Sequence, residues 1–260
     1  MSSQESGSRA SSVLHDRRGS DCRSVEVQMS GGQDSREKTL SAFQGFTTCN
    51  VSDALDALGI EGTIAGIGPL WPACPKIVGF AVTLKMSIAG REEVVIGSLE
   101  AVDAAMPGDL VVIDNRGRLD VNTWGGLVSL TAKKRGVVGT VIDGATRDVD
   151  EFQELGFPVY ARGTVPTSVR GRIAIEDQGI PIQCGRVVVE PGDLVMADRN
   201  GVAIIPRRCI EDVLNIAGRM VEIEARITRD IETGVHPIEA HRRHRYTDAV
   251  RLHNVKLDDE

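Results

Sequence analysis

At residues 141–148 the chain reads Val-Ile-Asp-Gly-Ala-Thr-Arg-Asp, and this stretch decides the fold. The apolar, β-branched run Val137–Ile142 predicts a buried strand, which opens into a glycine-containing loop that ends in Arg-Asp. Val149–Leu155 then has the pattern of a helix ending at Gly156, and Phe157–Ala161 predicts another strand. Because strands here alternate with helices, this region is typical of an α/β fold.

Working outward, similar elements occur on both sides of this unit. β-Branched runs predict strands at Ile77–Met86 and Val94–Ile96. Amphipathic patterns predict helices at Leu127–Arg135, just before Gly136, and at Ile210–Ile231. The α/β pattern therefore extends over most of the chain, and a long helix follows it.

The first organised segment is a short helix over Val51–Leu58, whose apolar residues fall at helical spacing. Asn50 is the expected N-cap, and Gly59 is the expected left-handed residue after the helix. One face of this helix is therefore expected to be buried against the rest of the domain.

One motif occurs twice in the chain: a Pro-Gly-Asp-Leu-Val run followed by an aspartate and a glycine. The copies are Pro107–Val111 with Asp114 and Gly117, and Pro191–Val195 with Asp198 and Gly201. Each copy predicts a turn that leads into a strand, which ends in a second turn. Two equivalent structural turns are favoured over two equivalent functional sites.

Composition divides the chain into a folded body and two polar ends. Residues 1–38 are rich in Ser, Arg, Gln and Gly and lack periodicity, which predicts a disordered N-terminal extension. Residues 39–235 are expected to form one domain that includes the C-terminal helix, and residues 236–260 a polar tail. A hydrophobic content of 41% is that of an ordinary globular protein.

Charge and hydropathy exclude several classes of partner. The net charge of −7 argues against a general nucleic-acid or membrane-surface binder. The sequence contains no apolar run long enough for a transmembrane helix and no apolar signal segment at its start. A cytoplasmic location is therefore expected, with neither nucleic acid nor membrane as a partner.

The distribution of histidine limits the chemistry. His15 lies near the start, and the other four histidines lie at or after His236. Catalysis in the body must therefore proceed without imidazole, which excludes Ser-His-Asp, Cys-His and His-ligated zinc schemes. The five cysteines are scattered and never in CxxC spacing, so a structural zinc site is not expected either. Carboxylates, arginines, backbone amides and a hard cation remain.

Two segments of the body carry such groups. Arg147 offers a forked donor to a carboxylate or enolate, and Asp148 can hold a divalent cation. Trp124–Leu127 places two glycines directly before a predicted helix, where open backbone amides favour an anion. Each signal alone is also compatible with an ordinary surface loop.

The long C-terminal helix contains one anomaly. Glu224 falls on its apolar stripe, at a position where the helical period calls for an apolar side chain. A carboxylate buried there needs a cation, an arginine or a subunit interface as a partner. Alternatively, the helix projects into solvent at this point, and the sequence favours neither interpretation.

Together these motifs are specific enough to identify a family. The segments that carry the resemblance are Val51–Leu55, Gly125–Leu127, Val141–Asp148, Glu154–Val159 and Pro191–Asp193. The chain resembles the 4-hydroxy-4-methyl-2-oxoglutarate/4-carboxy-4-hydroxy-2-oxoadipate aldolases, a family that includes the RraA-like proteins. The resemblance implies an α/β fold, a compact αββ sandwich of the swivelling-domain type with a long C-terminal helix. It also implies homotrimers or hexamers with active sites between subunits.

The resemblance further implies the chemistry of a class II pyruvate aldolase that uses Mg²⁺ or Mn²⁺. By this analogy Asp148 holds the metal, mainly through water, and Arg147 stabilises the enolate oxygen. Glu224, rather than Glu222, would reach the metal waters of a neighbouring subunit. The backbone amides expected to bind the substrate are those of Gly125, Gly126, Leu127 and Val128.

The sequence departs from the family pattern at one position. Active aldolases of this family usually carry an acidic residue where this chain has Gly126. Some relatives with glycine there carry an acidic residue three positions after the aspartate, and here that residue is Glu151. Residues three positions apart in a helix lie on nearly the same face. Glu151 is therefore expected on the same face as Asp148 and is a candidate catalytic carboxylate and metal ligand. It is equally compatible with a solvated helix position.

The expected activity is that of a lyase acting on a small 2-oxo acid. It would cleave 4-hydroxy-2-oxo acids to pyruvate and a carbonyl product, decarboxylate oxaloacetate, or do both. The alternative is a non-catalytic regulator that binds a ribonuclease or another protein partner, as the RraA members of the family suggest. The glycine at position 126 and the long polar tail keep that alternative open.

Overall fold

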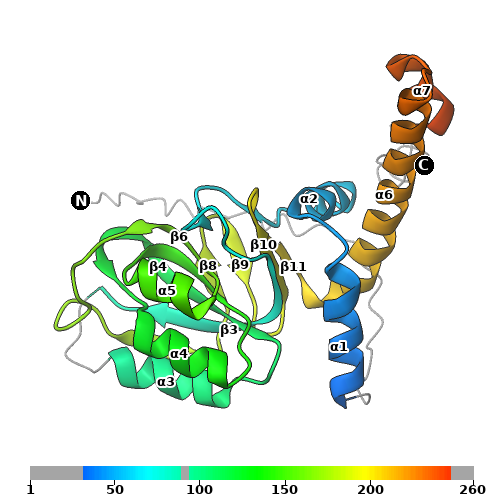
Figure 1. Ribbon diagram of the computed structural model, residues 1–260. Coiled ribbons are helices and arrows are strands. Elements are labelled where there is room, and N and C mark those ends of the chain that lie inside the picture. The colour runs from blue at the N-terminus through cyan, green and yellow to red at the C-terminus, as the bar shows by residue number, and fades with distance from the viewer. Residues whose placement is uncertain (1–31, 89–93, 247–260) are drawn as a thin grey trace, which may run out of the picture.

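The computed structural model describes residues 32–88 and 94–246 (Figure 1). Its helices are α1 (Gly32–Phe43), α2 (Thr48–Ala57), α3 (Val94–Ala104), α4 (Gly126–Lys134), α5 (Val149–Leu155), α6 (Ile210–Glu232) and α7 (Pro237–His244), with a 3-10 turn, η1, at Arg207–Cys209. Its strands are β1 (Thr63–Ile64), β2 (Gly68–Pro69), β3 (Ile77–Met86), β4 (Asp109–Asn122), β5 (Thr140–Thr146), β6 (Val159–Thr164), β7 (Ile175–Gln178), β8 (Ile182–Cys184), β9 (Val187–Val189), β10 (Leu194–Asp198) and β11 (Gly201–Ile205).

The described strands form one large sheet and one small hairpin. The sheet has nine strands, in the order β1-β11-β10-β3-β4-β5-β6-β2, with β7 paired to the end of β3. Its centre, β3 to β6, is parallel, whereas β10, β11, β1 and β2 pair antiparallel at the flanks. Strands β8 and β9 form the separate antiparallel hairpin. This mixed α/β architecture agrees with the fold that the sequence predicts.

The parallel centre is built by three successive strand–helix–strand crossovers. Helices α3, α4 and α5 connect β3 to β6 and lie together on one face of the sheet (Figure 1). Strand β5 is buried along its whole length, as expected for a strand in the middle of a covered parallel sheet. The carboxyl ends of β4 and β5 therefore lie side by side, and the chain leaves them toward the N-termini of α4 and α5.

A second apolar cluster joins the antiparallel flank of the sheet to α1, α2 and α6. Its buried members include Phe43, Val51 and Leu55 from the N-terminal helices, and Val213 and Met220 from α6. The second half of α6 and the whole of α7 project away from the body (Figure 1). Among the described helices, none is long and apolar enough to cross a membrane.

The two copies of the Pro-Gly-Asp motif are equivalent turns. Gly108 and Gly192 both have a φ of +85°, a region that glycine adopts without strain. In each copy the following aspartate accepts a hydrogen bond from the amide three residues before it, at 2.7 Å for Asp109 and 2.8 Å for Asp193. The interpretation as paired structural turns is confirmed.

Several predicted elements are confirmed at or near their bounds. Strand Ile77–Met86 and helix Val149–Leu155 have the predicted ends, and α6 ends one residue later than predicted. Gly136 and Gly156 adopt positive φ directly after or close to the ends of α4 and α5. These are the positions at which glycine most often terminates a helix.

Three local predictions are wrong. Val94–Ile96 begins helix α3 instead of forming a strand, because a short apolar run does not by itself distinguish the two. The strand predicted at Val137–Ile142 is shifted: residues 137–139 precede β5, and residues 143–146, expected in a loop, continue it, since pairing with β6 extends to Thr146. The N-cap of α2 is Thr47, and Asn50 instead completes a capping box with it.

The expected N-terminal extension also needs correction. Residues 32–38 belong to α1 and are not a structureless segment. Arg36 fixes this helix to the body, since its guanidinium lies 4.0 Å from the centre of the Phe80 ring and pairs with Asp109. The rest of the extension, residues 1–31, lies outside the described residues, as do residues 247–260 of the expected polar tail.

Candidate active site

The candidate site lies where the N-termini of α4 and α5 meet. Arg147 and Asp148 connect β5 to α5, and Gly125 is the N-cap of α4. The N–H of Gly126 donates to Oδ2 of Asp148 at 3.1 Å. The carboxylate of Asp148 therefore turns away from its own helix and binds the first amide of the neighbouring one.

The backbone of Asp148 is held in an unusual conformation. Its φ of 66° and ψ of 38° lie in the left-handed region, which residues other than glycine rarely adopt. Such a conformation costs about 1–3 kcal/mol and persists where the surroundings impose it. Non-glycine residues in this region concentrate at functional sites, which supports Asp148 as a candidate.

The side chain of Glu151 fills the space beside Gly126. A Cβ atom added to Gly126 would lie 1.6 Å from Oε2 and 2.6 Å from Cδ of Glu151. A Cβ added to Gly125 would likewise lie 2.7 Å from Oδ2 of Asp148. In this arrangement the carboxylates of Asp148 and Glu151 occupy the space beside the two glycines, so a side chain at either position would displace a carboxylate. The Glu151 carboxylate occupies the volume that a side chain at position 126 would use.

Arg147 has a donor with no partner in the described part of the chain. Its Nε is buried and forms no hydrogen bond there, although it lies 3.5 Å from Oδ2 of Asp148. The side chain as a whole is 39% exposed, so the guanidinium extends from this buried stem toward the surface. An unsatisfied buried donor costs roughly 1–3 kcal/mol, which indicates a group arranged for something other than stability.

Two hydrogen bonds fix the loop before α4 to the rest of the domain. The indole N–H of Trp124 donates to Oγ of Ser129 at 2.8 Å, and Oγ1 of Thr146 donates to the Trp124 carbonyl at 2.8 Å. Leu127, in contrast, is 77% exposed in the first turn of α4. The Gly126 amide, expected to bind substrate, is already bound to Asp148. Because Gly125 has no side chain to cap this turn, the amides of Leu127 and Val128 remain as the helix N-terminus that suits an anion.

Glu224 lies at a different place in the chain. It is half-buried on α6, and Oε1 accepts a hydrogen bond from the Tyr246 hydroxyl at 3.0 Å. Figure 1 shows α6 at the opposite end of the molecule from α4 and α5, so one chain does not bring Glu224 to Asp148. Glu222 is exposed and pairs only with Arg226, at 3.7 Å. Of the two glutamates, Glu224 is the one that is held in a defined environment.

Asp53 on α2 is a neighbour of Glu224 that the sequence did not single out. Partial burial raises the pKa of Asp53 above its usual value, and the charge of Glu224 raises it further. Burial likewise raises the pKa of Tyr246 to about 12, with a further contribution from its hydrogen bond to Glu224. Asp53 belongs to the Val51–Leu55 motif. The sequence pattern there predicted a helix and gave no reason to assign Asp53 to a functional site.

The four carboxylates considered for this site thus fall into two separate pairs, Asp148 with Glu151 near Gly126 and Asp53 with Glu224 at α2 and α6. No group of three His, Cys, Asp or Glu residues within residues 32–88 and 94–246 is arranged to hold a metal ion. All four groups are nevertheless hard oxygen donors, which is the ligand chemistry that Mg²⁺ and Mn²⁺ prefer. Carboxylate oxygens therefore fit such an ion, but either pair by itself supplies too few ligands to hold it.

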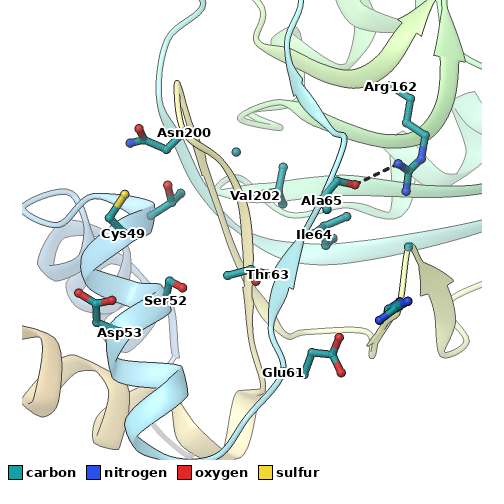
Figure 2. Close-up of a pocket in the computed structure, with 14 residues that line it drawn as sticks. Cys49, Ser52, Asp53, Glu61, Thr63, Ile64, Ala65, Arg162, Asn200 and Val202 are labelled. Atoms are coloured by element: carbon teal, nitrogen blue, oxygen red, sulfur yellow. Dashed lines mark hydrogen bonds between the residues drawn. The ribbon is translucent and has the colours of Figure 1, made fainter. Parts of the chain in front are cut away.

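Two cavities lie elsewhere. One, of about 820 Å³, lies between α2 and β1, and its lining includes Cys49, Ser52 and Asp53 from the helix and Thr63 from the strand (Figure 2). The other, of about 550 Å³, lies at the carboxyl ends of β3 to β6. Neither is lined by Arg147, Asp148 or Glu151. Cavity size alone therefore does not locate the candidate site in a single chain.

The smaller cavity is lined by charges that already have partners. Asp114 and Asp143 occupy the same register on β4 and β5. Asp143 pairs with Arg162 and accepts a hydrogen bond from the Gly185 amide at 2.7 Å. Asp114 accepts from the Gln183 amide at 3.4 Å. These aspartates fix the β8–β9 hairpin to the sheet, which is a structural role.

Comparison with known proteins agrees with this geometry. Residues 48–204, more than half of the chain, match the RraA-like family model, described as Aldolase/RraA. The chain belongs to the Aldolase/RraA family. A relative in this family is a putative 4-hydroxy-4-methyl-2-oxoglutarate aldolase of Halalkalibacterium halodurans, 35% identical over 202 residues that cover 78% of this chain and 92% of the relative.

Other Aldolase/RraA relatives differ in length and in the names they carry. Protein DlpA of Legionella pneumophila is 33% identical over 196 residues, which cover 74% of this chain but only 32% of that protein. An uncharacterized protein of Pseudomonas syringae has a similar structure, with a TM-score of 0.73, 29% identity and coverage of 79% and 93% of the two chains. RraAS2 of Streptomyces coelicolor, an unusual member of the RNase ES inhibitor RraA family, gives a TM-score of 0.67 at 26% identity, covering 72% and 95%.

Proposed function

We propose that this Aldolase/RraA-family chain is a divalent-metal-dependent lyase. Its substrates would be small 2-oxo acids: 4-hydroxy-2-oxo acids cleaved to pyruvate and a carbonyl product, oxaloacetate decarboxylated to pyruvate, or both. The observation that carries the proposal is the packing of the Glu151 carboxylate into the side-chain space of Gly126, beside Asp148 and Arg147. This chain thereby supplies a carboxylate at the position where its resemblance to the aldolases calls for one.

The substrate would bind between the two helix N-termini. Its carboxylate would accept hydrogen bonds from the amides at the start of α4, where Gly125 leaves the backbone open. The guanidinium of Arg147 would then point at the 2-oxo oxygen, on which negative charge grows during the reaction. The buried, unpartnered Nε of Arg147 supports this role, because a bound oxyanion nearby would satisfy it.

Both proposed reactions break the bond between C3 and C4 of the 2-oxo acid. In the cleavage, the C4 hydroxyl loses its proton and leaves as a carbonyl, and the electron pair of the broken bond forms the pyruvate enolate. In the decarboxylation, C4 leaves as carbon dioxide and the same enolate forms. A proton is then added at C3. Arg147 would stabilise the enolate oxygen in both cases, which explains how one site serves two reactions.

Asp148 and Glu151 would hold Mg²⁺ or Mn²⁺, directly or through water. A bound divalent cation supplies Lewis-acid polarisation of the 2-oxo acid. Within the chain, the amide of Gly126 orients Oδ2 of Asp148, and the glycine at 126 leaves Glu151 room to approach. Both carboxylates meet at the start of α4, where Oδ2 of Asp148 binds the Gly126 amide and the Glu151 carboxylate fills the space beside the same residue.

A second copy of the chain would complete the site. Helices α3 and α4 carry four exposed apolar side chains, namely Val95, Ile96, Leu127 and Leu130. Where such side chains gather on a surface, they are typical of an interface between proteins. A neighbour that covers it with its α2–α6 surface would bring Asp53 and Glu224 toward Asp148. The assembly we expect is a homotrimer or hexamer, with the active sites between subunits.

The test uses the purified full chain with oxaloacetate and, separately, with 4-hydroxy-4-methyl-2-oxoglutarate. Pyruvate is measured after treatment with EDTA and after addition of Mg²⁺ or Mn²⁺. We expect pyruvate only when the metal is present. If neither substrate yields metal-dependent pyruvate, the lyase proposal is wrong.

A regulator that binds a ribonuclease or another protein is the second candidate, and the similarity to RraAS2 favours it. Replacing Arg147 with Ala separates the two functions. A lyase loses its turnover in this variant. A regulator that acts through a surface away from the loop between β5 and α5 keeps its affinity for its partner.

A further inference from the structure

We propose that Tyr246 is a positioning residue for the Glu224 carboxylate, and that the segment after α6 serves the active site of a neighbouring subunit. We call residues 236–246 the C-terminal hook. This inference rests on the proposed function, in which Glu224 acts on the metal waters of a second copy. It adds a residue, Tyr246, and a structural element to which the family resemblance assigns no role.

Charged side chains hold the C-terminal hook against α6. Arg243 donates to Oδ2 of Asp230 at 2.9 Å and to Oε1 of Glu239 at 2.8 Å. His244 lies 3.0 Å from the same Asp230 oxygen. Asp230 on α6 thus binds two residues of the hook, which folds α7 back along the helix that carries Glu224 (Figure 1).

Tyr246 follows the helical part of the hook and makes the contact that concerns the site. Its hydroxyl donates to Oε1 of Glu224 at 3.0 Å, and its ring lies edge-on to His241 with 6.1 Å between the ring centres. A hydrogen bond from a neutral phenol fixes one carboxylate oxygen without neutralising it. The other carboxylate oxygen, Oε2 of Glu224, forms no hydrogen bond within the described part of the chain. It is therefore available to a group from outside that part, such as one on a second copy.

Asp53 explains why Glu224 needs such a contact. The charge of Glu224 raises the pKa of Asp53, so the two carboxylates lie close enough to repel each other. Without the Tyr246 hydroxyl, repulsion from Asp53 would turn the flexible Glu224 side chain toward solvent. The hook therefore holds in place a carboxylate that its own helix leaves unsupported.

The experiment compares Tyr246→Phe with Tyr160→Phe in the purified full chain. The chain has two tyrosines, and Tyr160 donates its hydroxyl to the Pro75 carbonyl in the core, at 3.0 Å. The control therefore removes the same atom far from the proposed site. We measure kcat and KM for oxaloacetate with Mn²⁺, and the binding of Mn²⁺ alone by the decrease of its free EPR signal.

We expect Tyr246→Phe to lower kcat roughly tenfold, to weaken Mn²⁺ binding severalfold, and to leave KM nearly unchanged. Tyr160→Phe should change none of these. The double variant Glu224→Gln/Tyr246→Phe should be no slower than Glu224→Gln alone, because Tyr246 acts through Glu224.

Three results overturn the inference. Unchanged kcat and unchanged Mn²⁺ binding in Tyr246→Phe show that the hydroxyl does not position Glu224. Additive losses in the double variant show that Tyr246 acts only through general folding. A wild-type chain that forms no metal-dependent pyruvate refutes the proposed lyase, and this inference with it. The last result is distinct from the first two, because both of those require an active wild type.

Discussion

The two carboxylate pairs of this chain are held in opposite ways. Asp148 and Glu151 follow the buried strand β5 and contact the start of α4. Oδ2 of Asp148 lies 3.1 Å from the Gly126 nitrogen, and the Glu151 carboxylate fills the space beside Gly126. Asp53 and Glu224 sit on helices outside the parallel sheet, and a single hydroxyl from the C-terminal hook supports one of them. The parallel sheet positions the first pair, whereas the second pair depends on α6, which projects from the body.

This difference indicates which of the two carboxylate pairs tolerates substitution of its surroundings. A group fixed by strand pairing cannot move without disturbing the core, so substitutions there act on chemistry through small displacements. A group on a projecting helix adjusts more easily, and its orientation must be set by added contacts. Substitutions around the first pair should therefore have the larger effects on turnover.

Arg147→Ala should abolish most of the turnover. Loss of a donor aimed at a developing oxyanion costs about 10²–10³-fold in kcat, and we expect the upper end because no other described cation is placed at this loop. A coupled assay of pyruvate from oxaloacetate measures the effect. Arg135→Ala, at the other end of α4, is the matched control and should retain normal turnover. Equal rates for the two variants would remove Arg147 from the chemistry.

Gly126→Ala should lower kcat by roughly 10-fold to 100-fold through Glu151, because the new Cβ would lie 1.6 Å from Oε2 of that residue. Glu151→Ala should cause a similar loss without a clash. The double variant Gly126→Asp/Glu151→Ala should regain part of the activity, since it moves the carboxylate to position 126. If the double variant is slower than both single variants, the two positions do not share one role.

Asp198→Asn tests the support of the second pair. Asp198 accepts hydrogen bonds from the amide and the hydroxyl of Thr48 at 2.8 and 2.7 Å, and so fixes the start of α2, which carries Asp53. We expect the free energy of unfolding at pH 7 to fall by about 1–3 kcal/mol. Denaturant unfolding measures this change, and Asp177→Asn, an exposed substitution on β7, serves as the control.

The pH dependence of the same variant has a definite sign. Burial raises the pKa of Asp198, but the hydrogen bonds from Thr48 and Asn200 outweigh it and leave the pKa below its usual value. Because the folded-state pKa is depressed, the stability contributed by Asp198 is present above the unfolded value of about 3.9. It is lost as the pH falls through the lower, folded value. The difference between wild type and variant should therefore shrink in acid.

The sequence predicted the regular elements of the sheet centre well, for identifiable reasons. β3 and α5 have strong periodicity and clear glycine or proline boundaries, so local patterns suffice. Val94–Ile96 was misassigned because three apolar residues fit a strand and a helix equally. The adjacency of Arg147 and Asp148 is covalent, and the placement of Glu151 follows from helical spacing.

The remaining features depend on contacts between distant segments. Asp53 approaches Glu224 only because α2 packs against α6, and Tyr246 reaches Glu224 only because Arg243 folds the hook back onto Asp230. Neither relation leaves a local pattern in the sequence. The apolar stripe left two interpretations of Glu224 open, and the structure combines parts of both. The second half of α6 projects from the body, and Glu224 is half-buried there with the Tyr246 hydroxyl as its partner, a group that the sequence did not suggest.

The close fit between Gly126 and Glu151 restricts how such a site can evolve. A carboxylate at one position excludes a side chain at the other, so the two arrangements are mutually exclusive alternatives. A lineage that passes from one to the other by single substitutions must cross a state with two colliding side chains or with no acid at all. Chains with glycine here would therefore be expected to keep the helical glutamate as a linked pair, inherited together.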